Sequence, residues 1–262
     1  MKGVGRRIGL DVRMVDGHLE CSPLDREDPR FCADFVLPSR RMVEACRADD
    51  FVFFRPFIDA GRLTVEQMHR AATRYHLGKT KSGFPMFWMI DETFDPQDAH
   101  IGSGGWVSTL LKKREPFICY WRPTHCLFGL HLLQGSSDNG RSWSENGQCF
   151  MNDDKAVAIV ESEASAVVLS EIFPECIWMA YATAEHLRTD LFLPLVGRTV
   201  IIFPRTDPYM SNWLFFNELA ASVRRQYGIS ISVDTTLEDY ASDGQKRRCI
   251  DLTDFLLESQ VT

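Results

Sequence analysis

The second half of the chain predicts an α/β fold built on a parallel sheet. Four short apolar runs, at 156–160, 176–182, 199–203 and 229–233, alternate with stretches of helical periodicity. Each run is long enough to cross a buried parallel sheet, and the helical stretches supply the crossovers that parallel strands need. We therefore expect residues 151–262 to form one sheet with helices packed on it through right-handed crossovers.

The helices of this half are predicted from the spacing of their apolar residues. One helix starts at Ser162, a short one covers 184–191, a long one covers 211–227 and a final one covers 252–257. Apolar residues three and four positions apart lie on one face of a helix. The face of the long helix that is expected to pack on the sheet carries Phe215, Phe216, Leu219, Ala220 and Val223.

The first half of the chain predicts a smaller α+β subdomain over residues 51–134. Thr64 and Gln67 fit a capping box, so we expect a helix from there to about Tyr75, with Gly78 as its C-cap. The aromatic-rich run 84–90 is typical of a strand.

The remaining residues predict little regular structure. Residues 1–50 mix charges and are interrupted by Pro23, Pro29 and Pro38, so we expect an irregular arm there. Residues 135–150 are rich in Ser, Asn and Gly, and this composition predicts a linker.

The composition is that of an ordinary globular protein. Of the 262 residues, 45% are hydrophobic and 25% are charged, and the formal net charge is −7. This charge provides no overall attraction for nucleic acid, so such contact depends on local basic groups. No apolar stretch approaches membrane-spanning length and no signal-peptide pattern begins the chain. We expect a cytoplasmic protein with no membrane partner.

The eight cysteines include no C-x-x-C pair, so no zinc ribbon is expected. Several of them lie within apolar runs, where a reduced thiol packs like a small hydrophobic side chain. The alternative is a loose metal site formed by Cys21, Cys32 and Cys46 with His18.

Acidic residues follow two of the predicted strands directly. Glu161 comes after 156–160, and Asp207 lies shortly after 199–203. The carboxyl ends of parallel strands form the edge at which α/β sheets bind ligands, and carboxylates there suit Mg²⁺. Such an ion organises phosphates in nucleotidyl and phosphoryl transfer. The alternative is that these acids cap helices. Further candidate ligands are Glu163, Asp251 and Asp254.

The two acid-ended strands resemble the motifs of the TOPRIM family, the fold shared by bacterial primases, topoisomerases and related nucleases. Residues 159–166 (IVESEASA) resemble the family's first motif, a hydrophobic strand that ends in Glu. Residues 203–207 (FPRTD) stand where the family has a strand ending in Asp-x-Asp. The resemblance implies a TOPRIM-like sheet domain over 151–262, with Glu161 and Asp207 as catalytic residues and Mg²⁺ or Mn²⁺ as the cofactor.

The first half extends the resemblance to the bacterial primase core. Residues 75–78 (YHLG), 84–91 (FPMFWMID) and 126–133 (CLFGLHLL) are similar to segments that precede TOPRIM in primases. The order of segments, with 251–257 (DLTDFLL), is similar to an uncharacterised group of TOPRIM-like proteins from Bacteroidetes genomes and mobile elements. The resemblance covers about residues 50–258 and makes 51–134 a primase-core-like subdomain.

Three departures from the family bear on activity. Arg205 stands in place of the first acid of Asp-x-Asp, YATA at 181–184 replaces a Gly-Gly, and AHIGSGG at 99–105 lacks the usual basic residues. A guanidinium held about 5 Å from a divalent ion repels it by roughly 6–7 kcal/mol at an effective dielectric constant near 20. Alternatively, Arg205 contacts a phosphate directly through paired hydrogen bonds.

The resemblance leaves two functions open. The first is a primase-related protein that acts on DNA or RNA in replication or transfer of a mobile element, with a helicase or relaxase as a partner. It implies metal ligation by Glu161, Asp207 and Asp251. Lys79, Lys81, Lys112 and Arg205 would then contact the nucleic-acid backbone. The second is a catalytically inactive TOPRIM-like module that binds nucleic acid or a protein partner.

Overall fold

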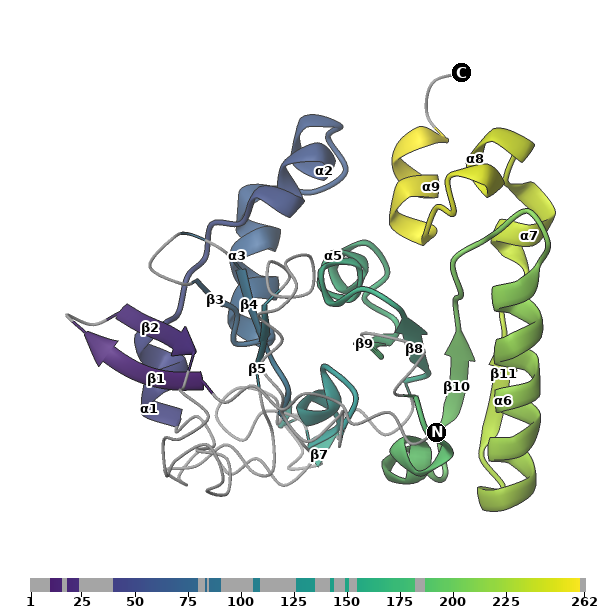
Figure 1. Ribbon diagram of the computed structural model, residues 1–262, viewed down its shortest axis with the longest axis horizontal. Coiled ribbons are helices and arrows are strands. Elements are labelled where there is room, and N and C mark those ends of the chain that lie inside the picture. Colours follow the sequence, from purple (N-terminus) through teal and green to yellow (C-terminus); the bar gives the residue numbers. More distant parts are fainter. Residues whose placement is uncertain are drawn as a thin grey trace.

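A computed structural model describes the fold of the chain (Figure 1). The described residues are 10–15, 18–23, 40–79, 83, 85–90, 106–108, 126–134, 142–143, 149–150, 155–181 and 187–259.

The second half contains the predicted parallel sheet. Its strands are β8 (Val157–Val160), β9 (Ile177–Ala180), β10 (Thr199–Ile202) and β11 (Ser230–Val233), in the order β11-β10-β8-β9. All three pairings are parallel, with Ala158 beside Trp178 on one side and Ile201 on the other. Every residue of β8 and β9 is buried, as expected for strands that are covered on both faces. The prediction of a parallel α/β sheet is confirmed.

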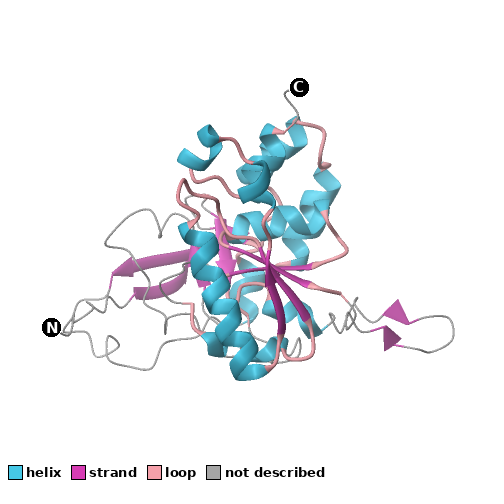
Figure 2. Cartoon of the chain, turned by 90° about the vertical axis from the view of Figure 1, so that its right-hand side faces the viewer, coloured by secondary structure: helices cyan, strands magenta, loops and turns pink. Residues whose placement is uncertain are grey.

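Helices α5 (Glu163–Ile172) and α6 (Ser211–Tyr227) lie on opposite faces of this sheet (Figure 1). The strand order explains this arrangement, because β9 is added beside β8 in one direction and β11 beside β10 in the other. Right-handed crossovers then place the two connecting helices on different faces. Figure 2 shows the strands running between the helices, with further helices beyond one end of the sheet.

The ends of α5 and α6 follow their local sequence. Ser162 is the N-cap of α5 and accepts a hydrogen bond from the Ser165 amide at 3.5 Å. α6 ends at Gly228, which adopts the left-handed conformation that glycine tolerates best. The long helix is therefore confirmed, but the prediction that Phe215 packs on the sheet is wrong. Phe215 is 43% exposed, whereas Phe216, Ala220 and Val223 are buried.

Three short helices follow β11 beyond the carboxyl end of β10 (Figure 1). They are α7 (Thr236–Tyr240), α8 (Asp243–Arg247) and α9 (Leu252–Glu258). Only α9 corresponds to a predicted helix, because the five-residue α7 and α8 are too short for periodicity to indicate. The predicted helix over 184–191 is wrong in its described part, where η6 (Thr189–Leu195) is a 3₁₀ helix that contains Pro194.

The first half contains small antiparallel pairings. Strands β3 (Gly78–Lys79), β4 (Pro85–Trp88) and β5 (Trp106–Ser108) form one sheet in that order. β6 (Ser142–Trp143) pairs with β7 (Cys149–Phe150) inside the predicted linker. Residues 1–50, expected to be irregular, contain the hairpin β1 (Leu10–Val15) with β2 (His18–Pro23) and the helix α1 (Arg40–Ala45).

Three helices of this half precede β3: η2 (Val52–Phe54), α2 (Arg55–Asp59) and α3 (Val65–Arg74). A fourth, η3 (Leu130–Gln134), follows the small sheet. The capping box of α3 is confirmed, since Thr64 accepts from the Gln67 amide and the Gln67 side chain accepts from the Thr64 amide. Within the described ranges, no helix is long and apolar enough to cross a membrane.

The prediction that Gly78 caps α3 is wrong. The C-cap is Tyr75, and His76 adopts the left-handed φ of 52° that turns the chain. Gly78 lies in β3, where an added Cβ would be 2.9 Å from the Cys46 carbonyl oxygen. Glycine is therefore needed for the close approach of two backbones, not for the end of the helix.

One hydrophobic core contains residues from both predicted units. Phe128 pairs with Ala180 through two backbone hydrogen bonds and so extends the edge of β9. The Tyr75 hydroxyl donates to the Trp178 carbonyl at 2.8 Å, and its ring stacks on Phe128. The described parts of 51–134 and 155–259 therefore pack directly on each other.

A buried carboxylate joins α3 to α5 in this contact. The side chain of Glu171 is only 3% exposed and pairs with Arg70 at 2.8 Å and with Arg74 at 3.0 Å. Arg74 also lies 3.4 Å from the hydroxyl of Ser170. A buried charge is costly unless it is paired, so this contact depends on both arginines.

We expect Arg70→Ala/Arg74→Ala to destabilise the protein by about 3 kcal/mol, because it leaves the Glu171 charge buried without partners. Urea unfolding at neutral pH measures the change. Arg247→Ala, at an exposed position, is the matched control. Adding Glu171→Gln to the double variant should recover part of the loss, since the amide carries no charge. Equal stability of the double variant and the control would contradict this account.

A buried histidine at the same contact makes stability depend on pH. Burial, followed by the neighbouring His76, lowers the pKa of His131 to about 3. The unfolded chain protonates His131 near pH 6.5, whereas the folded chain resists protonation. This contribution is therefore complete above pH 6.5 and is lost as the pH falls from 6.5 towards 3, by up to about 1.4 kcal/mol per unit. Unfolding of His131→Gln between pH 7 and 5 should show a shallower slope, while the exposed His69→Gln keeps the wild-type slope.

Candidate functional site

The carboxyl ends of the parallel strands gather the candidate residues at one edge of the sheet. Glu161 follows β8 directly and Tyr181 follows β9. Arg205 lies three residues after β10, and Asp234 follows β11. Parallel pairing in register is what brings these chain ends together. We call this region, with the start of α9 that lies against it, the carboxyl edge.

Arg205 connects three segments of the carboxyl edge. Its Nη1 lies 3.6 Å from Glu161 Oε2, and its Nε donates to the Cys249 carbonyl at 3.0 Å. The two charged side chains are 42% and 34% exposed, so water screens their attraction. The next residue continues the contact, because the Thr206 amide donates to the Ile250 carbonyl at 3.1 Å. The guanidinium is thus held between β8 and the segment that leads into α9.

Asp251 begins α9 and uses both carboxylate oxygens within the fold. It is the N-cap of a capping box with Asp254, and its Oδ1 accepts from the Asp254 amide at 3.0 Å. The same oxygen accepts from the Thr253 hydroxyl at 2.5 Å, and Oδ2 accepts from the Ser165 hydroxyl at 2.6 Å. Asp251 therefore joins the first turn of α9 to the first turn of α5.

Two pKa values at the carboxyl edge are raised, chiefly by burial and to a lesser extent by neighbouring carboxylates. Burial, with a further contribution from Glu161, raises the pKa of Tyr181, and the positive charge of Arg205 only partly offsets this. Burial and the neighbouring Asp251 likewise raise the pKa of Asp254, again against a lowering by Arg205. One guanidinium therefore serves as the cation for several acidic groups here.

Asp207 has a different local role. Its Oδ1 accepts from the Tyr209 amide at 2.9 Å, and its Oδ2 accepts from the Asn212 amide at 2.8 Å. Burial would raise its pKa, but these backbone hydrogen bonds and that from Ser211 outweigh burial and hold the pKa below its ordinary value. The ionised carboxylate thus neutralises the start of α6.

The structure brings some of the predicted site residues together. Glu161 and Arg205 form an ion pair. Together with Asp251, they all lie close enough to Tyr181 to influence its pKa. Asp207 makes its hydrogen bonds within its own turn. In the part of the chain that the structure describes, no group of three or more His, Cys, Asp or Glu side chains is arranged to hold a metal ion.

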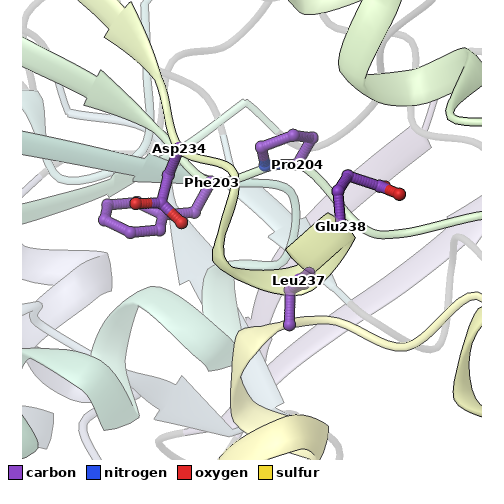
Figure 3. Close-up of a pocket in the computed structure, with 5 residues that line it drawn as sticks. All are labelled: Phe203, Pro204, Asp234, Leu237 and Glu238. Carbon is purple, nitrogen blue, oxygen red and sulfur yellow. The ribbon is translucent and has the colours of Figure 1, made fainter. Parts of the chain in front are cut away.

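A shallow hollow lies beside the carboxyl edge, between the ends of β10 and β11 (Figure 3). It is lined by Phe203, Pro204, Asp234, Leu237 and Glu238 and is about 200 Å³ in volume, open to solvent. Its carboxylates lie at opposite ends and are engaged, since Asp234 accepts from the Thr236 amide and Glu238 from the Thr206 hydroxyl. The hollow is too shallow to enclose a small molecule.

The predicted nucleic-acid contacts are described in part. Lys79 lies in β3, 3.5 Å from Asp50 and over the ring of Phe51 at 5.3 Å. Lys81 and Lys112 lie outside the described residues. Arg205 points its guanidinium at Glu161 and Cys249, so its observed partners are those of a structural ion pair.

Two contributors to the carboxyl edge were not singled out from the sequence. Tyr181 is 2% exposed, and its position directly after an apolar strand was the available signal. Ser165 is buried and hydrogen-bonds to Asp251, 86 residues later. No local sequence pattern relates Ser165 to Asp251, so only the packing of α9 on α5 reveals this contact.

Comparison with family models finds a match to part of the chain. A family model described as a domain of unknown function (DUF6371) matches residues 146–206, a range that contains β8, α5, β9 and β10. The match includes Glu161 and Arg205 and ends before Asp207. Neither the curated proteins nor the solved structures contain a match. The resemblance to TOPRIM proteins and primases stays a prediction.

We expect Asp207→Ala to destabilise the protein by about 1–2 kcal/mol, because it removes an acceptor for two backbone amides at the start of α6. Urea unfolding at pH 7 measures the loss. Asp59→Ala, at an exposed position in α2, should change stability by less than about 0.5 kcal/mol. If the two variants unfold at the same urea concentration, the capping role of Asp207 is wrong.

Proposed function

We propose that this chain is a TOPRIM-like, primase-related protein that associates with nucleic acid or a protein partner and performs no metal-dependent chemistry at its carboxyl edge. The observation that carries the proposal is the ion pair between Arg205 and Glu161. It places a positive charge beside the glutamate that the resemblance makes the central catalytic residue.

Electrostatics favours this proposal over an active metal centre. The Arg205 guanidinium lies 3.6 Å from the Glu161 carboxylate. A divalent ion bound by that carboxylate would therefore be repelled by the guanidinium. Swinging Arg205 outward would break its hydrogen bond to the Cys249 carbonyl as well as the ion pair. The guanidinium thus supplies permanently the positive charge that an ion would otherwise supply.

The other proposed ligands support the same conclusion. Asp207 accepts two backbone hydrogen bonds at the start of α6. Asp251 accepts one from the Asp254 amide and two from the hydroxyls of Thr253 and Ser165. Recruiting either carboxylate to a metal would give up part of this capping. The acids are therefore accounted for by the fold itself, which is the alternative that the sequence left open for them.

Association with nucleic acid in replication or transfer of a mobile element rests on the resemblance of the segment order to primases. Glu161 would then organise the edge through Arg205 instead of acting as a base. A helicase or relaxase is the kind of protein partner that this context implies.

We expect the purified chain to form no primer and no nick when it is supplied with nucleotides, single- or double-stranded DNA, and Mg²⁺ or Mn²⁺. The same preparation should bind a labelled single-stranded DNA or RNA in fluorescence anisotropy, with an affinity that falls as salt rises. The resting protein should also give no Mg²⁺ binding in calorimetry, whereas Arg205→Asp should gain it. Arg205→Lys, which keeps the positive charge, is the matched control and should not.

If the chain forms a primer or a nick only with metal, and Glu161→Gln abolishes that activity, the proposal of an inactive edge is wrong and the site is an active centre. Binding of neither DNA nor RNA would remove the nucleic-acid part of the proposal. If Arg205→Asp binds no Mg²⁺ and is as stable as wild type, the guanidinium is not the cation of this edge. Circular dichroism of each variant separates these outcomes from loss of fold.

A further inference from the structure

Four apolar side chains are exposed together at the turn into α6. Tyr209 is 84% exposed, Met210 40%, Leu214 54% and Phe215 43%. The first two precede the helix, and the other two lie in its first turns, Leu214 on the side away from Phe216, Ala220 and Val223 and Phe215 at the flank. We call these residues the outer α6 patch. Single exposed apolar residues are common, but a contiguous group of this kind marks interaction sites.

The fold holds the turn that presents this patch in a strained conformation. Met210 has a φ of 57° and a ψ of 23°, a left-handed conformation that is costly for a residue with a Cβ. Asp207 fixes it from both sides by accepting from the amides of Tyr209 and Asn212. Strain of roughly 1 kcal/mol or more persists only where neighbours impose it, and it concentrates at functional segments.

The inner side of the patch is anchored in the core. Phe216 is 1% exposed and lies 5.1 Å from the ring of Tyr181, and Phe215 meets Phe216 edge-on at 5.1 Å. Leu214 and Phe215 therefore project from a helix that is anchored in the core, and Tyr209 and Met210 from the turn that precedes it. A preorganised surface loses little conformational entropy when it binds a partner.

The charge around the patch selects the class of partner. Residues 206–223 contain Asp207 and Glu218 and no lysine or arginine. Asp207 more than offsets the half positive charge at the start of α6, and exposed Glu218 lies one helical turn beyond Leu214. Glu218 is thus the exposed charged side chain of residues 206–223, and it attracts a positively charged segment more than an anionic one.

We propose that the outer α6 patch, on the turn into α6 and its first turns, docks an amphipathic helix of a protein partner, with lysine or arginine flanking its apolar face. A helix surface such as that of α6 packs well against another helix through ridges and grooves. Glu218 would meet a basic residue of the partner while Tyr209, Leu214 and Phe215 contact its apolar stripe. This docking goes beyond the proposed function and holds whether or not the carboxyl edge is catalytic.

The test uses a defined probe, a labelled helical peptide of leucine and lysine with leucines at helical spacing, and a matched peptide with glutamate in place of lysine. Fluorescence anisotropy should show the lysine peptide binding at least tenfold more tightly. Leu214→Ser/Phe215→Ser should weaken that binding at least tenfold. Glu218→Lys should weaken it several-fold and reduce the preference for lysine over glutamate. Tyr240→Ser removes an apolar side chain that is 74% exposed outside the patch and should change nothing.

Tyr209→Ser, at the most exposed position of the patch, repeats the test if the double variant fails to fold. Equal binding of the two peptides, or binding that survives the patch variants, overturns the proposal. A labelled (dT)20 oligonucleotide whose binding is lost in the same variants would assign the patch to nucleic acid instead. Self-association in sedimentation experiments that Leu214→Ser/Phe215→Ser abolishes would assign it to a second copy of this chain and would equally overturn it.

Discussion

Parallel pairing of β8 with strands on both of its sides is the constraint on which the rest of the structure depends. Because β8 lies between β9 and β10, all three strands end at the same edge. This brings Glu161, Tyr181 and the segment before Arg205 to one place. It also sends α5 and α6 to opposite faces, so one helix meets α3 and the other presents its outer surface (Figure 1).

The charge at that edge is balanced within the chain. Arg205 pairs with Glu161, reaches the carbonyl before α9 and moderates the pKa values of Tyr181 and Asp254. A covalently attached guanidinium has no binding equilibrium, so its positive charge is present at any concentration of metal ion. The neighbouring acids are then free to cap helices, and this division of roles is why we propose a binding function for the edge.

A second balance of charge joins the two parts of the chain. Glu171, buried on α5, is paired by Arg70 and Arg74 of α3, and Tyr75 bonds to the backbone of β9 next to this contact. The sheet, its carboxyl edge and the described part of residues 51–134 are thereby held in a fixed relation. The outer α6 patch lies on the other face of the sheet, where a partner can bind without disturbing this contact.

The sequence by itself determined the parallel sheet, the α3 capping box and the long α6, because these depend on local periodicity and capping groups. It also placed Glu161 and Arg205 just past the ends of two strands, and the structure pairs those strands directly. Tertiary structure alone decided what those side chains contact. The role of Gly78 beside Cys46, the exposure of Phe215 and the bond from Ser165 to Asp251 all depend on segments distant in sequence. Side-chain identity specifies what a residue can bond to, but only packing supplies the partner, and at Arg205 that partner is a glutamate of the same chain.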